Sequence, residues 1–203
     1  MQDDNKEESK VTQKKRKKES QLFSAAYELF TTKGTQNTAI DDIVKKAGVA
    51  KGTFYLYFKD KYDIINRLIL KKSSVLVKEA VKEVESQNIE DFDQKVLFFI
   101  DYLIEYFKEN KLMLKLINKN FSWGLFRRSL MQKEEDHNVE EVSRLFIDNL
   151  IKKDMDNEEA VITLFIIFEL IGSVCYSSII LEEPMNIDKI KPVLYKKVLK
   201  IIE

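Results

Sequence analysis

Apolar residues recur every three to four positions along most of the chain, which is the spacing of helices with one buried face. The first such segment covers residues 14–34, where Leu22, Ala26 and Phe30 fall on one side. Gly34 follows the last apolar position and is typical of a helix end. The pattern therefore predicts a first helix that begins in a run of basic residues.

Two shorter helices are expected next, joined by a tight turn. The first shows the i, i+3, i+4, i+7 pattern at Ile40, Ile43, Val44 and Ala47. Thr38 can cap its amino end and Gly48 can make the turn after it. Residues 51–58, KGTFYLYF, then form the second short helix.

The rest of the chain is also predicted to be helical. Asp60 can cap a long helix that continues to about Val84. Further segments with helical periodicity are 91–109, 111–119, 122–153 with a break near 136–138, 158–182 and 187–202. No segment alternates apolar and polar residues long enough to indicate a strand, so we expect an all-α fold of about nine helices.

The composition supports helices and argues against several classes of site. Five glycines and two prolines in 203 residues leave few tight turns. One cysteine, Cys175, and one histidine, His137, cannot supply an internal disulfide or a familiar zinc site. His137 lies in a polar break, where we expect it to be solvated. The sequence shows no nucleophile paired with a base and no glycine-rich phosphate loop, so we expect no enzyme, cofactor or metal.

Charge is distributed unevenly although the chain is neutral overall. Residues 1–61 hold thirteen Lys and Arg against nine Asp and Glu, and from Lys10 to Lys61 the count is twelve against five. Positive charge near the amino end favours a polyanion as partner. Residues 1–12 are polar, without the apolar stretch of a signal or anchor, so we expect a disordered tail and a cytoplasmic protein.

The short helix at 51–58 has two different faces. At about 100° per residue, Phe54 and Phe58 fall together and are expected to be buried. The remaining surface carries Lys51, Gly52, Thr53, Tyr55, Leu56 and Tyr57. Burying both tyrosines as well would require a helix apolar on nearly every side, so we expect them to face a partner. A helix, a glycine turn and a presented second helix are the layout of a helix-turn-helix, whose second helix enters the DNA major groove.

This part of the chain resembles the TetR family of bacterial transcriptional repressors. The resemblance covers AAYELFTTKGTQNTAIDDIVKKAGVAKGTFYLYFKDKYDII, residues 25–65. It rests on the elements A-x-x-L-F-x-x-K-G, D-I-x-x-x-A-G-V and K-G-T-F-Y-x-Y-F-x-x-K-x-x-I, in this order. Residues 70–203 are similar only in being helical. The resemblance implies a DNA-binding domain at 13–62 and an effector-binding and dimerisation domain at 63–203.

Family function can be transferred only to matching positions. The resemblance assigns the DNA-facing surface to Lys51, Gly52, Thr53, Tyr55, Leu56 and Tyr57, and phosphate contacts to Thr38 and Lys61. Asp41 departs from the basic or polar residue common in relatives, which speaks against a base contact there. The run KKRKK at 14–18 fits either a solvated helix end or a contact with the DNA backbone or minor groove.

The resemblance also implies an effector site among the middle helices. These helices are rich in aromatic residues, most of which belong to a core. An apolar cavity with a few polar groups would suit a small ligand. The candidates for lining it are Phe99, Tyr102, Tyr106, Trp123, Phe165 and Phe168.

Residues 160–181 form the most apolar segment and contain one charge, Glu169. Their length would span a bilayer, so a membrane-anchored helical signalling protein is an alternative. The flanking charges are mostly acidic and give no positive-inside signal. In the TetR family the last two helices form a four-helix dimer interface, which 158–182 and 187–202 would supply here.

The sequence therefore favours a cytoplasmic, homodimeric, TetR-like repressor that binds a palindromic operator and is released by a small, largely apolar effector. Activation in place of repression fits the same residues. A helical enzyme or carrier that retains the DNA motif is a further alternative.

Overall fold

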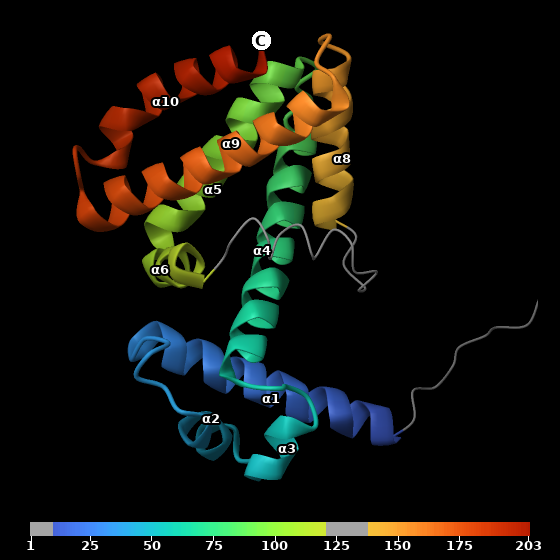
Figure 1. The fold of residues 1–203 in the computed structure, drawn as a ribbon, viewed down its shortest axis with the longest axis vertical. Helices are drawn as coiled ribbons and strands as arrows, with labels where there is room; N and C mark the ends of the chain where they lie inside the picture. Colours follow the sequence, from blue (N-terminus) through green and yellow to red (C-terminus); the bar gives the residue numbers. More distant parts are fainter. Residues whose placement is uncertain (1–9, 121–137) are drawn as a thin grey trace, which may run out of the picture. The chain divides into compact units, whose positions relative to one another are not determined.

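The computed structural model of the protein describes residues 10–120 and 138–203, and all regular structure in these ranges is helical (Figure 1). The all-α prediction is confirmed. The elements are α1 (Lys10–Thr32), α2 (Ile40–Ala47), α3 (Lys51–Tyr55), α4 (Lys61–Ser86), α5 (Phe92–Glu109), α6 (Lys111–Asn120), α8 (Asn138–Ile151), α9 (Asn157–Cys175), its π-helical continuation η1 (Tyr176–Leu181) and α10 (Ile187–Ile202).

Two predicted boundaries need correction. Helix α1 begins at Lys10, so residues 10–12 are helical and do not belong to a disordered tail. Residues 1–9 lie outside the described part of the chain. Helix α3 ends at Tyr55, earlier than the predicted 58, and Leu56 is its C-cap.

The predicted cap of α2 was also wrong. The N-cap residue is Ala39, whose backbone N–H donates to the Asp42 carboxylate at 3.0 Å. The Thr38 hydroxyl instead faces the carbonyl oxygens of Gly34 (2.9 Å) and Leu29 (3.4 Å), and the residue is only 1% exposed. Thr38 therefore holds the end of α1 against the start of α2, and its hydroxyl is not available to a phosphate in this conformation.

The chain divides into two compact units between Leu68 and Ile69. Helix α4 begins in the first unit and continues into the second. Its first turns belong with the amino-terminal helices: the Arg67 guanidinium lies 5.6 Å from the centre of the Phe58 ring and pairs with Asp63 at 2.9 Å. The compact unit thus extends a little beyond the domain limit expected at residue 62.

The first unit is held by a small core shared among its helices. Phe58 anchors the end of the α3 segment between two other rings, with Phe23 at 5.1 Å and Phe54 at 5.4 Å between ring centres. The other buried side chains are Leu22, Ala25, Ala26, Leu29, Phe30, Ile43, Val44, Ala47, Ile64, Ile65 and Leu68. This core fixes the orientation of the short α3, which is too short to be stable without tertiary packing.

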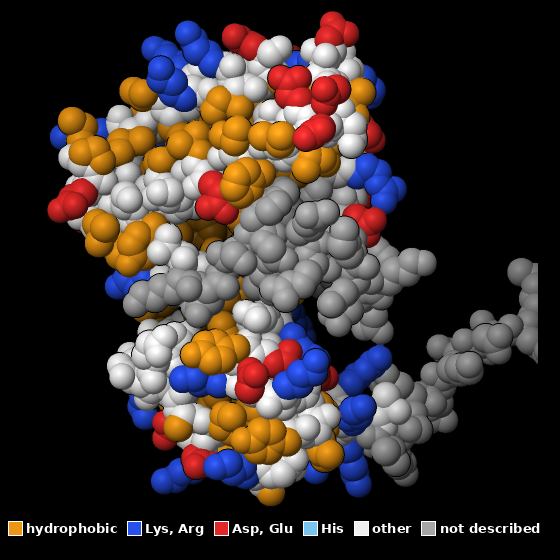
Figure 2. Space-filling view, viewed as in Figure 1, with side chains coloured by type: hydrophobic (Ala, Val, Ile, Leu, Met, Phe, Trp, Pro, Cys, Tyr) orange, Lys and Arg blue, Asp and Glu red, His pale blue; other side chains and the backbone are white. Residues whose placement is uncertain are grey.

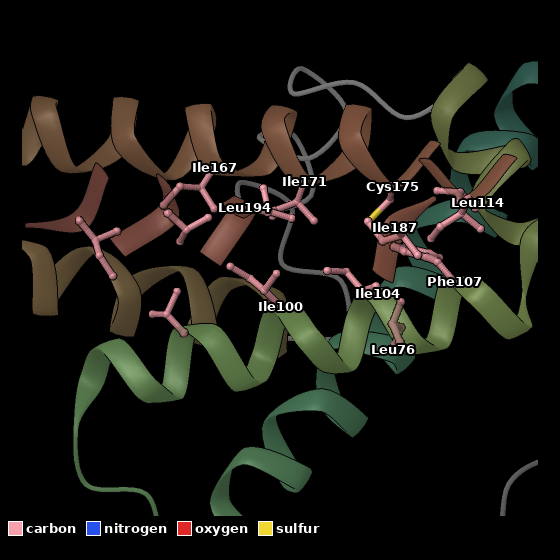
Figure 3. Packing of buried hydrophobic residues seen from close by; sticks show 14 of the residues in the cluster. Leu76, Ile100, Ile104, Phe107, Leu114, Ile167, Ile171, Cys175, Ile187 and Leu194 are labelled. Carbon is pink, nitrogen blue, oxygen red and sulfur yellow. The ribbon is translucent and has the colours of Figure 1, made fainter. Parts of the chain in front are cut away.

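The second unit has a separate core in which α5, α9 and α10 contact one another. Figure 3 shows Ile100 and Ile104 of α5 pointing toward Ile167 and Ile171 of α9, with Leu194 of α10 between the helices. All five side chains are buried. Together they account for the apolar periodicity predicted for these three segments.

An ionic network joins α5 to α10 at the edge of this core. Lys191 of α10 pairs with Asp101 and with Glu105 (2.7 Å), both on α5, and the Tyr195 hydroxyl donates to Asp101. Partial burial alone would raise the pKa of Asp101, but the hydrogen bonds from Lys191 and Tyr195 outweigh it and hold that pKa below its ordinary value. The network therefore stabilises the contact only while the carboxylates are ionised.

Candidate nucleic-acid interface

The turn between α2 and α3 depends on a glycine. Gly48 adopts a left-handed backbone with φ 67° and ψ 34°, a conformation that is costly for residues with a Cβ atom. Its N–H approaches the Lys45 carbonyl at 3.3 Å, and the Val49 N–H donates to the Val44 carbonyl at 3.0 Å. These bonds close the end of α2 and direct the chain into α3.

The segment from Lys51 to Phe58 presents one side and buries the other. Phe54 is completely buried and Phe58 nearly so, whereas Tyr55 is 54% and Leu56 78% exposed. Lys51 and Gly52 are also exposed, while Thr53 and Tyr57 are half-buried. The division into two faces follows the periodicity of the sequence. Large apolar surface left open on a short helix indicates a surface for a partner.

Gly52 has a different role from Gly48. Its φ is not in the left-handed region, and a Cβ built on it would meet no atom within 4 Å. Neither the backbone conformation nor packing against the described residues requires glycine at this position. An absent side chain on an exposed helix instead allows a partner to approach the backbone closely.

Charged residues surround this surface and are partly paired with one another. Lys51 at the start of α3 lies 2.8 Å from Asp41 of α2, and this hydrogen bond and charge raise the pKa of Lys51. Asp41 therefore neutralises part of the positive charge at the presented face, an ion pair that sequence reasoning missed. Lys61 donates to the backbone carbonyl of Thr35 at 2.8 Å, which places its ammonium beside the loop that precedes α2.

Tyr57 joins this surface to the beginning of α1. Its hydroxyl donates to the backbone carbonyl of Lys15 at 3.1 Å, across 42 positions of sequence. The predicted DNA-facing tyrosine is thus half-buried, with its hydroxyl directed at the basic end of α1.

The amino-terminal unit matches the family model described as bacterial regulatory proteins, tetR family, over residues 22–68. Residues 22–68 belong to the TetR family. The match begins inside α1, contains α2, α3 and the turn between them, and ends in α4, so it coincides with the unit that carries the presented face.

Curated relatives of this chain are bacterial regulators. The fatty acid metabolism regulator protein of Bacillus subtilis is 36% identical over 73 residues, which are 36% of this chain and 38% of that protein. The HTH-type transcriptional regulator YvdT of the same organism is 50% identical over 48 residues, 24% of this chain and 25% of that protein. The chain thus matches only a quarter to about two fifths of the length of these two relatives.

Solved structures share the fold over most of the chain. The transcriptional regulator FadR from Bacillus subtilis, in complex with stearoyl-CoA, superposes with a TM-score of 0.63 at 17% identity and covers 91% of this chain and 100% of its own. A TetR-family regulator from Haemophilus influenzae gives 0.61 at 16% identity, covering 95% and 98%. At this identity the likeness shows the fold alone, but it includes the second unit, which lies outside the family match at residues 22–68.

The predicted ligand-lining residues fall into different environments. Phe99, Tyr102 and Tyr106 follow one another along a single side of α5 and are half-buried, and the two tyrosines pack against the core of the second unit. Burial, followed by the nearby charges of Glu79 and Glu83, raises the pKa of the Tyr102 hydroxyl.

The other three candidates lie outside α5 in the sequence. Phe168 of α9 is half-buried. Phe165 lies on the outer side of α9 and is 37% exposed, because α9 turns Thr163, Ile167 and Ile171 into the core. A lining role for Phe165 and Phe168 stays a prediction. Trp123 lies outside the described residues, as does His137.

Helix α9 has an apolar outer side. Ile162, Phe165 and Ile166 are exposed at helical spacing, and Figure 2 shows hydrophobic side chains gathered over this helix. Within the described residues, the segment Asn157–Leu181 is long and apolar enough to cross a membrane, with a mean hydropathy of 2.1. Its inner side nevertheless packs into the core of the second unit. Ile162 and Ile166 on its outer side stay exposed among residues 10–120 and 138–203.

Proposed function

We propose that the protein is a transcriptional repressor that binds a palindromic DNA operator as a homodimer and releases it when a small, largely apolar effector binds. The observation that carries this proposal is the presented side of α3. Tyr55 and Leu56 are exposed there while Phe54 and Phe58 fix the helix from behind. A helix held in this way can enter a major groove as one rigid element.

We assign DNA contacts to six of the predicted positions on this surface and to one lysine beside it. Exposed Gly52 allows close backbone approach, and Tyr55 and Leu56 offer ring and methyl groups to base edges. The assigned residues are Lys51, Gly52, Thr53, Tyr55, Leu56, Tyr57 and, for phosphate, Lys61. Thr38 is withdrawn because its hydroxyl is buried.

A second copy of the chain is the proposed cover for the outer side of α9. Exposed Ile162 and Ile166 form an apolar stripe, and Gly172 lies near its end, which would let a second helix approach closely. The stripe occupies one side of the helix and includes exposed Glu169, whereas lipid would favour apolar residues around the whole helix. We therefore favour a cytoplasmic dimer over a membrane anchor. Two copies would present two α3 helices to a two-fold operator.

The effector is proposed to contact the half-buried aromatic side of α5. Phe99, Tyr102 and Tyr106 combine ring surface with two hydroxyls, as a mainly apolar ligand with few polar groups requires. The FadR structure with the same fold holds stearoyl-CoA, which joins a long apolar acyl chain to a large charged head. This supports an effector of the same general character.

Release would follow from a shift between two conformations of the dimer. An effector that binds more tightly to the conformation that does not fit the operator lowers the affinity for DNA. The size of this effect is set by the difference between the affinities of the effector for the two conformations. A tenfold to hundredfold loss of DNA affinity requires only about 1.4–2.8 kcal/mol of coupling. Helix α4 is the proposed connection because it is continuous from the first unit into the second.

The experiment that tests this function begins by selecting bound duplexes from a random pool with the purified protein. Fluorescence anisotropy then measures the affinity for the selected and a scrambled duplex. We expect a palindromic sequence and an affinity that falls steeply with salt. Tyr55→Ala should abolish the preference for the selected duplex while circular dichroism and the dimer stay unchanged. An unchanged preference, or no enrichment from the pool, would refute the proposal.

A further inference from the structure

The first turns of α1 carry five consecutive basic residues, Lys14 to Lys18, in helical conformation. All five are exposed, and Figure 2 shows Lys and Arg side chains gathered at this end of the helix. At a rise of about 1.5 Å per residue, they lie within about 7 Å along the helix axis. Five consecutive helical positions point to all sides of the axis, so positive charge surrounds this part of α1.

Local physics opposes a helix with this composition. Lys14 and Lys18, at i and i+4, repel each other, and so do Lys14 and Lys17 at i and i+3. Positive charge near an amino end is also unfavourable to the helix dipole. No acidic residue lies in the first turn of α1, and no ion pair of Lys14, Lys15, Lys17 or Lys18 occurs among residues 10–120 and 138–203. An anionic partner would relieve this repulsion.

The position of the run is fixed relative to α3. The hydroxyl of Tyr57 donates to the Lys15 carbonyl at 3.1 Å, so the second turn of α1 lies beside the end of the presented segment. Figure 1 shows α1 continuing past α3 within the amino-terminal unit. Side chains from this end of α1 can therefore reach backbone phosphates of a duplex whose major groove is occupied by α3.

We propose that the basic end of α1 is a second phosphate-binding surface, which contacts the sugar-phosphate backbone beside the base pairs that α3 contacts. It rests on the proposed function, since it requires that α3 binds DNA. Lysine ammonium groups act on phosphates as point charges without base preference. The surface would raise affinity for any duplex long enough to reach it and would not change which sequence is preferred.

DNA suits this surface better than a lipid membrane. A helix that binds a bilayer surface needs an apolar face opposite its basic residues. Residues 12–18 are Thr-Gln-Lys-Lys-Arg-Lys-Lys and contain no apolar side chain. The link through Tyr57 to the α3 segment also connects the run to the proposed DNA-binding surface.

The test replaces Lys14, Lys15, Lys17 and Lys18 together by Gln, which keeps helix propensity and removes the charge. Each lysine that neutralises a phosphate adds about 0.9 to the slope of log affinity against log salt. We therefore expect the slope to fall by about 2 to 4, on selected and scrambled duplexes alike. The ratio of the two affinities should stay the same.

A matched control tests whether the change in slope comes from contacts at these positions or only from the loss of net charge. Changing four exposed lysines of the second unit to Gln removes the same charge, at Lys78, Lys82, Lys95 and Lys115. This control should keep the wild-type slope. A second measurement uses duplexes shortened base pair by base pair at both ends. We expect the wild type to lose affinity at a duplex length at which the affinity of the variant is still unchanged.

Failure of the inference and failure of the proposed function give different results. If the α1 lysines were a solvated helix end, wild type, variant and control would all bind the selected duplex with one slope, and the inference would be overturned. If the protein did not bind DNA, the wild type would show neither enrichment nor a salt-dependent affinity. Loss of binding to phosphatidylglycerol vesicles by the variant, with unchanged DNA binding, would also overturn the inference in favour of lipid.

Discussion

Leu56→Ala and Phe54→Ala should change the free energy of unfolding by very different amounts, because these residues are two positions apart and face opposite ways. Leu56 is 78% exposed, so about a fifth of its side chain is covered by the protein itself. Full burial of a leucine stabilises by about 1.5–3 kcal/mol. Leu56→Ala should then lower the free energy of unfolding by no more than about 0.6 kcal/mol. Phe54 is fully buried, and Phe54→Ala should cost about 3–5 kcal/mol.

For DNA binding by the folded protein, we expect Leu56 to matter more than it does for stability. If a duplex covers the open four fifths of Leu56, its removal loses about 1–2 kcal/mol of binding, a weakening of about 5- to 30-fold in Kd. Fluorescence anisotropy with the selected duplex measures this change, and thermal unfolding followed by circular dichroism measures stability. Leu145→Ala on α8, where leucine is 54% exposed, is the matched control for binding and should leave Kd unchanged. By the same argument it should lower the free energy of unfolding by no more than about 1.4 kcal/mol.

Two results would refute this reasoning. A Leu56→Ala protein that unfolds as easily as Phe54→Ala would mean that Leu56 is packed in solution. A Leu56→Ala protein with unchanged stability and unchanged Kd would mean that the open side of α3 does not meet DNA.

Further predictions concern the glycine of α3, the dimer surface and the ionic network. Gly52→Ala should leave stability unchanged or slightly higher, because alanine favours helices and a Cβ meets nothing in this chain, yet should weaken DNA binding in the anisotropy assay. Equal affinity would show that no partner approaches this backbone. Ile166→Asp should convert a dimer to a folded monomer in analytical ultracentrifugation, since it places a charge in the proposed apolar interface; a persistent dimer would place the interface elsewhere. Asp101→Asn should lower the unfolding temperature at neutral pH by removing the ionised partner of Lys191 and Tyr195. Because the pKa of Asp101 is held below its ordinary value, that stabilisation is present above about pH 4 and is lost as the pH falls through the folded pKa, so wild type and variant should converge in acid. A gap that persists in acid would contradict the ionic origin of this contact.

The sequence by itself determined the helices and the two faces of α3. Both depend on groups three or four residues apart in the chain, because backbone hydrogen bonds and the 3.6-residue turn are local. Phe54 and Phe58 are buried, and Asp60 caps α4 by accepting from the Asp63 N–H at 2.9 Å, as their local patterns indicate. The TetR motif lies in the same region, where local patterns are strongest.

Only the tertiary structure decided which groups from distant segments meet. Thr38 lost its expected capping role because packing brings it to the Leu29 and Gly34 carbonyls. The sequence could not show which way Phe165 points, because a helix that is apolar on nearly all sides does not reveal its buried side. The structure places Phe165 on the outer side of α9. The bond from Tyr57 to Lys15 joins residues 42 positions apart, and no local pattern encodes such a pairing. Local hydrogen bonding fixes where helices begin and end, whereas the shared burial of side chains from remote segments fixes which sides they turn to one another.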